Sequence, residues 1–242
     1  VIETQPQSAS VEIDDEAMPA WQRQSMQRSL QSARARAHAR SNRFVSAAMK
    51  LLQETGSTDF TVQDVVDRSK MSIRTFYKYF RSKEDLLVAL YETVVAQEAV
   101  PRLRRRVEKS KDPMLRLRAF VDGLVDLTTK TGQPLAARTL VNYQNRLAES
   151  RPEDLAAAMK PEFDLLVELI ADIARVRPLR KGLTVETAAR LVHYTLLAAV
   201  HGRVLGSEGA FDVTAKTIWE FCLSGMGITV GGSPAKSRRT TA

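Results

Sequence analysis

The sequence predicts an all-α protein of about nine helices. Apolar residues recur at helical spacings of three and four along most of the chain. No segment shows the strict alternation of a strand or the turn residues of a hairpin. The composition agrees, because only 11 Gly and 9 Pro interrupt a chain that is rich in Ala, Leu, Glu, Arg and Lys.

Composition also limits the class of protein. The 242 residues, 44% hydrophobic and 26% charged, suffice for one large or two small globular domains. A net charge of +8 suits a polyanionic partner. The single cysteine excludes an intrachain disulfide and a cysteine-based metal cluster. The sequence has no membrane-length apolar run and no recognisable signal peptide, so we expect a cytoplasmic protein with no membrane partner. We also expect no cofactor and no metal.

The charges at the N-terminus are divided into two blocks. Residues 1–20 carry five acidic residues and no basic one, whereas residues 21–43 carry six arginines and no acidic one. We expect residues 1–27 to be a disordered extension, acidic and then basic, and residues 231–242 to be a flexible basic tail. The basic block has two open interpretations, a solvated tail or an arm that reaches DNA phosphates or a minor groove.

The next stretch predicts a first helix that ends at Gly56. Its apolar stripe consists of Phe44, Ala47, Ala48, Leu51 and Leu52. A second, short helix spans 62–69, with Thr61 as its N-cap because a threonine hydroxyl accepts a hydrogen bond from a free amide of the first turn.

After a turn at Lys70-Met71, Ser72 is expected to cap a third helix that runs to about residue 79. We expect Ile73, Phe76 and Phe80 to face inward. The polar residues left to face outward are Arg74, Thr75, Tyr77, Lys78 and Tyr79. Such a helix suits the major groove of DNA, so residues 28–90 are interpreted as a helix-turn-helix domain.

The outward residues have expected roles on DNA. Thr61 could offer its amide and hydroxyl to a phosphate, and Ser72 and Thr75 are short donors near the start of the third helix. Arg74 could make two hydrogen bonds to a guanine edge. The residues expected to hold phosphates or sugars are Tyr77, Lys78 and Tyr79. Because so small a unit reads few base pairs, we expect a homodimer on a palindromic operator in double-stranded DNA.

The pattern T-V-x-D-V-V-x-R-S-x-M-S-x-R-T-F-Y-x-Y-F-x-S-K-E-D-L-L, which begins at Thr61, resembles the N-terminal domain of the tetracycline-repressor (TetR) family of bacterial transcription regulators. The resemblance covers residues 44–90. It implies that Lys83, at the start of a fourth helix capped by Ser82, binds a phosphate. One departure is Lys70-Met71, where the family usually has a small residue, often Gly, and then an aliphatic one.

The remaining helices would form an effector-binding and dimerisation domain over residues 91–230. The fourth helix is expected to run from 83 to about 106, kinked or ended at Pro101. Further helices are expected at 115–130, from Pro134, from Pro152 with an interruption near Pro161, at 184–205 and at 212–224.

The resemblance places the dimer seam in the last two helices and an apolar effector pocket in the rest of the domain. The residues expected to line that pocket are Phe120, Leu124, Leu127, Leu140, Tyr143, Gln144, Phe163, Leu166, His193, Leu197 and His201. A small hydrophobic effector would then release the repressor from its operator.

Two other classes stay open at this point. One is a DNA-binding protein that needs no effector, or that activates transcription. The other is an enzyme that uses Cys222 as nucleophile with His193 or His201 as base. The enzyme is disfavoured, because Cys222 lies in an apolar helical stripe and no phosphate loop, nucleophile elbow or zinc motif occurs in the sequence.

Overall fold

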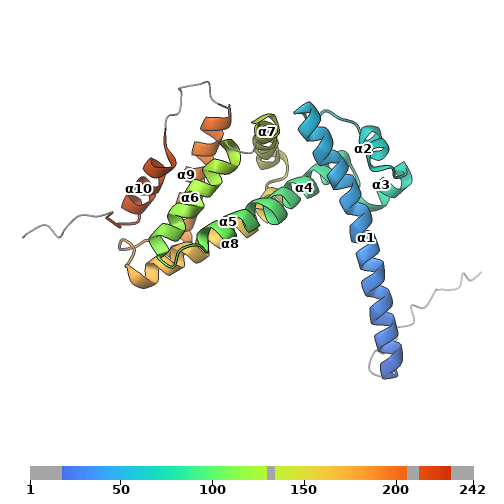
Figure 1. Ribbon diagram of the computed structural model, residues 1–242, viewed down its shortest axis with the longest axis horizontal. Coiled ribbons are helices and arrows are strands. Elements are labelled where there is room, and N and C mark those ends of the chain that lie inside the picture. Colours follow the sequence, from blue (N-terminus) through green and yellow to red (C-terminus); the bar gives the residue numbers. More distant parts are fainter. Residues whose placement is uncertain (1–17, 130–133, 206–212, 230–242) are drawn as a thin grey trace, which may run out of the picture. The chain divides into compact units, whose positions relative to one another are not determined.

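The computed structural model describes residues 18–129, 134–205 and 213–229 (Figure 1). The acidic extension before residue 18 and the basic tail lie outside these residues. The elements are α1 (Ala20–Thr55), α2 (Val62–Ser69), α3 (Ile73–Tyr79), α4 (Lys83–Thr93), η1 (Val94–Ala99, a π-helix), α5 (Val100–Val107), α6 (Pro113–Thr129), α7 (Pro134–Ser150), α8 (Pro152–Val176), α9 (Val185–Leu205) and α10 (Ala215–Gly225). Because α4, η1 and α5 are continuous, the described residues form nine helical rods, and they contain no strand. The all-α prediction is confirmed.

The chain divides into two compact units, residues 1–43 and 44–242. In the first unit, helix α1 starts at Ala20, and its side chains are exposed almost throughout. The prediction of disorder was therefore wrong for residues 20–27. Alanine, glutamine and arginine all have high helix propensity, and no Gly or Pro interrupts the segment after Pro19.

One hydrophobic cluster holds the N-terminal helices of the second unit. It contains the α1 stripe from Phe44 to Leu52 together with residues of α2, α3 and α4. The rings of Phe44 and Phe76 meet edge to face at a centroid distance of 5.5 Å, and those of Phe76 and Phe80 lie 5.6 Å apart. The same cluster continues into α7 through Tyr143 and Leu147.

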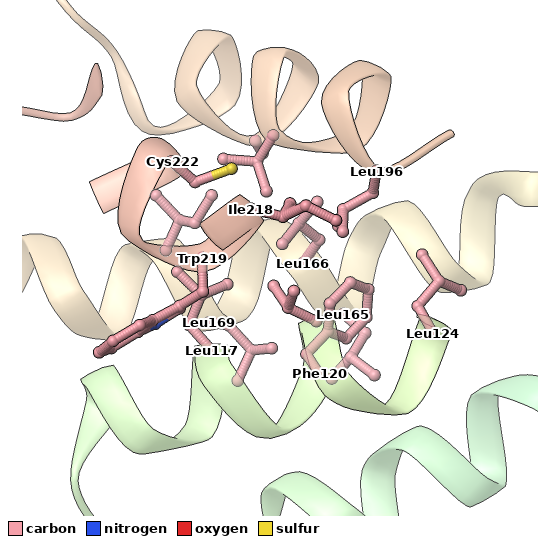
Figure 2. Close-up of a cluster of buried hydrophobic side chains, with 14 of the residues drawn as sticks. Leu117, Phe120, Leu124, Leu165, Leu166, Leu169, Leu196, Ile218, Trp219 and Cys222 are labelled. Atoms are coloured by element: carbon pink, nitrogen blue, oxygen red, sulfur yellow. The ribbon is translucent and has the colours of Figure 1, made fainter. Parts of the chain in front are cut away.

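A second cluster forms the core of the C-terminal domain. Figure 2 shows side chains of α6, α8, α9 and α10 meeting in it, among them Phe120, Leu165, Leu196 and Trp219. Leu124, Leu166 and Cys222 also belong to it. Aromatic and branched side chains buried on this scale supply most of the stability of the domain.

The π-helix has a local cause at Pro101. A proline ring clashes with the carbonyl four residues earlier, here that of Gln97, and offers no N–H to it. In the π-helix the Val100 amide donates to Val95, five residues earlier, and the chain then continues as α5 to Val107. The helical run thus passes Pro101 and ends one residue beyond the predicted end.

Pro161 was expected to interrupt its helix, but α8 continues through it from Pro152 to Val176. A proline costs a helix interior about 3 kcal/mol. Buried residues on both sides offset this cost, because Met159 and Leu165 each pack into a core cluster.

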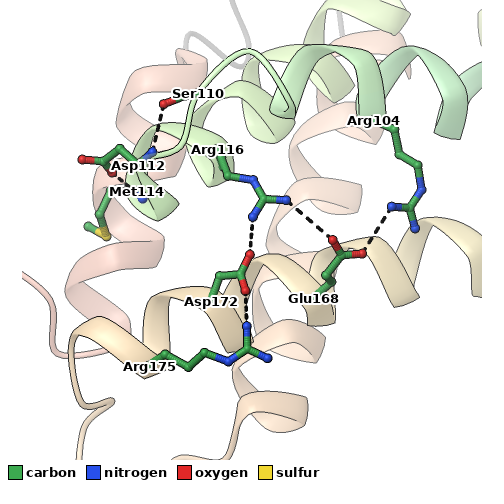
Figure 3. A network of polar contacts seen from close by, with 8 residues as sticks. All are labelled: Arg104, Ser110, Asp112, Met114, Arg116, Glu168, Asp172 and Arg175. Atoms are coloured by element: carbon green, nitrogen blue, oxygen red, sulfur yellow. Dashed lines mark hydrogen bonds and ion pairs between the residues drawn. The ribbon is translucent and has the colours of Figure 1, made fainter.

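An ion-pair network on the surface joins α5, α6 and α8 (Figure 3). Glu168 accepts from Arg104 at 3.2 Å and pairs with Arg116 at 3.6 Å. Arg116 and Arg175 both pair with Asp172. Two carboxylates of α8 are therefore shared among three arginines from three helices.

Candidate nucleic-acid interface and effector cavity

Capping residues define the ends of α2 and the start of α3. Thr61 and Asp64 form a capping box at the start of α2, as each side chain bonds the backbone N–H of the other. Lys70 ends α2 in the left-handed conformation, with φ 54° and ψ 41°. Ser72 then caps α3 by accepting from the Thr75 amide at 3.2 Å. Thr61 and Ser72 therefore cap their helices as predicted.

Helix α3 has its aromatic anchor inside and its polar residues outside. Phe76 is fully buried, while Arg74 and Lys78 are exposed and Thr75 is half-buried. Tyr77 is 56% exposed although its ring packs edge-on against Phe76. The exposed side chains of α3 therefore include a guanidinium, a phenol and an ammonium group.

Ile73 and Tyr79 differ from expectation. Ile73 was predicted to face inward, but it is 47% exposed, because the first turn of α3 lies at the edge of the cluster that Phe76 and Phe80 enter. Tyr79 was assigned to the outer face, but it is half-buried and packs against the same cluster. Only part of its side chain is accessible to a nucleic acid.

Thr61 and Lys83, both predicted to bind phosphate, already have partners in the protein. The Thr61 amide and hydroxyl each donate to Asp64 Oδ2 at 2.7 Å. These bonds lower the pKa of Asp64, so the donors face a carboxylate. Lys83 Nζ donates to the Thr58 carbonyl at 3.0 Å. A phosphate would have to share or displace these acceptors, which the sequence could not reveal.

Polar contacts connect the helix-turn-helix with α7 and α8. Arg151 Nη1 lies 2.9 Å from Asp85 Oδ1, in the first turn of α4. The Tyr143 hydroxyl donates to the Glu84 carbonyl at 3.4 Å, and the Thr139 hydroxyl donates to the carbonyl of Gly56. These contacts hold the helix-turn-helix against α7 and the residue before α8, through the start of α4 and the residue that follows α1.

A cavity of about 520 Å³ lies among α7, α8 and α9. Its lining residues are mainly apolar, with a few polar groups: Gln144, Asn145, Ala148, Pro152, Leu155, Ala156, Met159, Lys160, Phe163, Arg190, His193, Tyr194, Leu197 and His201. Its volume falls in the range of small-molecule sites. Because Met159 also belongs to the cluster that contains Phe76, the cavity wall and the recognition-helix anchor share one hydrophobic core.

Five of the predicted pocket residues line this cavity: Gln144, Phe163, His193, Leu197 and His201. Six others do not: Phe120, Leu124, Leu127, Leu140, Tyr143 and Leu166. These six lie in or against the two core clusters, because apolar periodicity marks buried residues without saying whether they face a neighbour or a space.

Nine lining residues were not predicted, although two spacings in the sequence point to four of them. Leu155, Met159 and Phe163 recur every four residues on α8 and lie on one face of it. This face was not predicted because Pro161 was expected to interrupt the helix. Arg190 and Tyr194 extend the α9 stripe on which His193, Leu197 and His201 had been found.

Gln144 and two histidines belong to the polar part of the cavity lining, together with Asn145, Lys160 and Arg190. Gln144 Oε1 lies 3.5 Å from His201 Nε2, and Gln144 Nε2 donates to Met159 Sδ at 3.4 Å. His193 Nε2 lies 3.4 Å from Glu162 Oε1, and both side chains are buried. Burial lowers the pKa of His201, which favours its neutral form.

Cys222 is separate from this cavity. It lies in the core between Trp219 and Leu223 of α10, and burial raises the pKa of its thiol to about 11. A thiol of this kind is poorly reactive, since the thiolate is the nucleophile. Within the described residues there is no group of three or more side chains that could hold a metal, and no helix long and apolar enough to cross a membrane.

The helix-turn-helix is similar in sequence to a known group of regulators. Residues 44–90 match the family model described as bacterial regulatory proteins, tetR family. Residues 44–90 are therefore a DNA-binding domain of the TetR type. No curated protein sequence is similar enough to count as a relative.

Solved structures of TetR-family regulators share the fold over most of this chain. Thermus thermophilus FadR, a TetR-family repressor in complex with lauroyl-CoA, is 21% identical with a TM-score of 0.63, over 81% of this chain and 98% of that one. RolR in complex with resorcinol is 16% identical with a TM-score of 0.63, over 80% and 90%. SmeT, the repressor of the Stenotrophomonas maltophilia efflux pump SmeDEF, is 20% identical with a TM-score of 0.57, over 80% and 94%. The TetR fold thus extends well beyond the matched domain.

Proposed function

We propose that this protein is a homodimeric transcription repressor that a small hydrophobic effector releases from a palindromic operator. One observation carries the proposal: the buried anchor of the recognition helix, Phe76, and a wall of the cavity, Met159, belong to the same hydrophobic cluster. A molecule that displaces the wall therefore acts on the packing that positions α3.

On DNA, Arg74 would read a guanine edge, because its guanidinium is exposed in the first turn of α3. Tyr77 and Lys78 would hold phosphates, and Ser72 and Thr75 would supply short donors. Lys83 would reach a phosphate only by sharing its ammonium group with the Thr58 carbonyl. Thr61 would contribute mainly by fixing the start of α2.

The dimer would form through α9 and α10. Leu191 and Tyr194 are 55% and 58% exposed on α9, and Phe221 is 66% exposed on α10. Large apolar side chains exposed together on adjacent helices are typical of an interface. Ala198 and Gly202 follow on α9, where their small size allows a second helix to approach.

In the proposed mechanism, a bound effector shifts α8 against α4 and changes the separation of the two recognition helices. They then no longer fit successive major grooves of the operator. A tenfold loss of DNA affinity needs a difference of only about 1.4 kcal/mol between the two states.

We assign no catalytic role to the chain, because Cys222 is a buried thiol with a raised pKa and the histidines line a cavity that it does not reach. A regulator of this kind works where the bacterial chromosome is, in the cytoplasm.

The first test is binding of the purified protein to the DNA that flanks its own gene, by fluorescence anisotropy at several salt concentrations. We expect tight binding that survives competitor DNA, with two protomers per site. Weak binding with the same salt dependence as on random DNA would contradict a local repressor.

A further inference from the structure

The amide group of Gln144 lacks a strong acceptor. Gln144 is 7% exposed and lines the cavity. Its Nε2 donates to the thioether of Met159 at 3.4 Å, and the described part of the chain offers it no other acceptor. A thioether sulfur is a weak acceptor, and burying a donor without a good partner is unfavourable.

The neighbouring His201 fixes which end of the amide remains available. A neutral imidazole donates through one nitrogen only, and His201 Nε2 faces Gln144 Oε1 at 3.5 Å. With Oε1 accepting from the ring, the NH₂ group is the end that needs a further partner. The partner that this group still needs is therefore a hydrogen-bond acceptor and not a donor.

The charges of the cavity have one sign. Among its lining residues the ionic side chains are Lys160 and Arg190, and no acidic residue belongs to the lining. The acidic residues nearest along the helices are already paired, since Asp164 accepts from Lys160 at 2.6 Å and Glu186 accepts from Arg190 at 2.9 Å.

Glu162 is a buried acid that does not belong to this lining, and it lies close to His193, which does. Its Oε1 is 3.4 Å from His193 Nε2, and its side chain is buried. A cationic ligand would therefore find no carboxylate in the lining. An anionic one would meet the amide donor of Gln144, which lacks a strong acceptor, in a lining whose two ionic side chains are cations already paired with acids outside it.

We propose that the effector is an apolar organic acid, whose carboxylate accepts hydrogen bonds from the Gln144 amide while its apolar part packs against Leu155, Met159 and Phe163. This inference rests on the proposed effector role of the cavity and specifies its ligand. Hydrogen bonds to a charged acceptor are roughly twice as strong as neutral ones, so the carboxylate sets the preference.

The test compares three ligands of equal chain length, decanoate, decanol and decylammonium, by isothermal titration calorimetry on the full chain without DNA. We expect decanoate to bind at least about tenfold more tightly than either of the others. Equal or tighter binding of decanol or decylammonium, or no binding of decanoate, would overturn the inference.

Variants of Gln144 test whether its amide is the group that binds the carboxylate of decanoate. Gln144→Glu has the same shape but replaces the donor by a carboxylate, so it should reverse the order of decanoate and decylammonium. The matched control is Asn142→Asp, which adds the same charge on an exposed position of α7 and should leave the order unchanged. Gln144→Leu, which places no charge in the interior, should reduce decanoate affinity to that of decanol. If decanoate still binds Gln144→Leu tightly, the amide is not its partner.

Operator binding, measured separately by anisotropy, keeps the two proposals distinct. A protein that binds decanoate selectively but has no specific DNA site would refute the repressor and leave the ligand class standing. A protein that binds its operator but prefers decylammonium would refute only the ligand class.

Discussion

Arg151 and Asp85, 66 residues apart in the sequence, lie 2.9 Å from each other and join the edge of the cavity to the first turn of α4. Arg151 directly precedes Pro152, which lines the cavity. The other oxygen of Asp85 accepts from the Arg81 amide at 3.1 Å, just after the recognition helix. The bond to Asp85 raises the pKa of Arg151, which keeps its guanidinium charged.

A double-mutant cycle on this pair should show coupling. The changes are Arg151→Met, which keeps the length of the side chain, and Asp85→Asn, and the measurement is urea unfolding. We expect a coupling free energy of about 1 kcal/mol, because both side chains are partly buried but still in contact with water. The exposed pair Lys160–Asp164, treated in the same way, should give about 0.3–0.5 kcal/mol. Equal values would mean that Arg151 and Asp85 form an ordinary surface pair.

The outer face of α3 should separate base contacts from phosphate contacts. Arg74→Ala should relax the preference at one operator position by about 1–3 kcal/mol, because a paired contact to a guanine is lost. Lys78→Ala should weaken every DNA sequence alike and reduce the slope of log affinity against log salt by about 0.9. Anisotropy with operator and single-base variants at several salt concentrations measures both effects. Identical behaviour of the two variants would refute this division of roles.

Lys70 occupies a backbone conformation that suits glycine. Its φ of 54° makes it the one non-glycine residue with positive φ among the described residues. We expect Lys70→Gly to raise the free energy of unfolding by about 0.5–1 kcal/mol, since removing Cβ relieves the left-handed strain. The control is Lys50→Gly, at an exposed position inside α1, which should lower it by about 1 kcal/mol. Chemical denaturation of both variants measures the difference, and a loss of stability in both would show that Lys70 makes a favourable contact.

His201 should make the protein less stable in acid. Burial lowers its pKa in the folded state, so below about pH 6.5 the unfolded chain binds a proton that the folded chain resists. Its contribution is therefore neutral at higher pH and becomes destabilising as the pH falls. In urea unfolding at about pH 7.5 and about pH 5.5, His201→Gln should reduce the loss of stability between the two values. An unchanged loss in His201→Gln would contradict the assignment.

Local features of the fold could be predicted from the sequence because they depend on neighbours in the chain. The caps at Thr61, Ser72 and Ser82 are of this kind, as is the end of α1 at Gly56. The burial of Phe76 follows from the helical period alone. The resemblance to the TetR family rests on the same stretch, where cap, apolar and aromatic positions all agree, and the family model matches it there.

Other features depend on residues that are far apart in the sequence, and only the tertiary structure shows them. Phe120 and Gln144 are both buried, but one packs in a core and the other faces a cavity, and only the positions of neighbouring helices distinguish them. Pro161 breaks a helix by local rules, yet burial on both sides of it keeps α8 continuous. The partners of Lys83 and Arg151 lie 25 and 66 residues away. The sequence by itself determined the helix type, the caps and the buried anchor Phe76, because these depend on spacings within a few turns. The cavity and its connection to α4 depend on contacts between distant segments, which only the packed chain brings together.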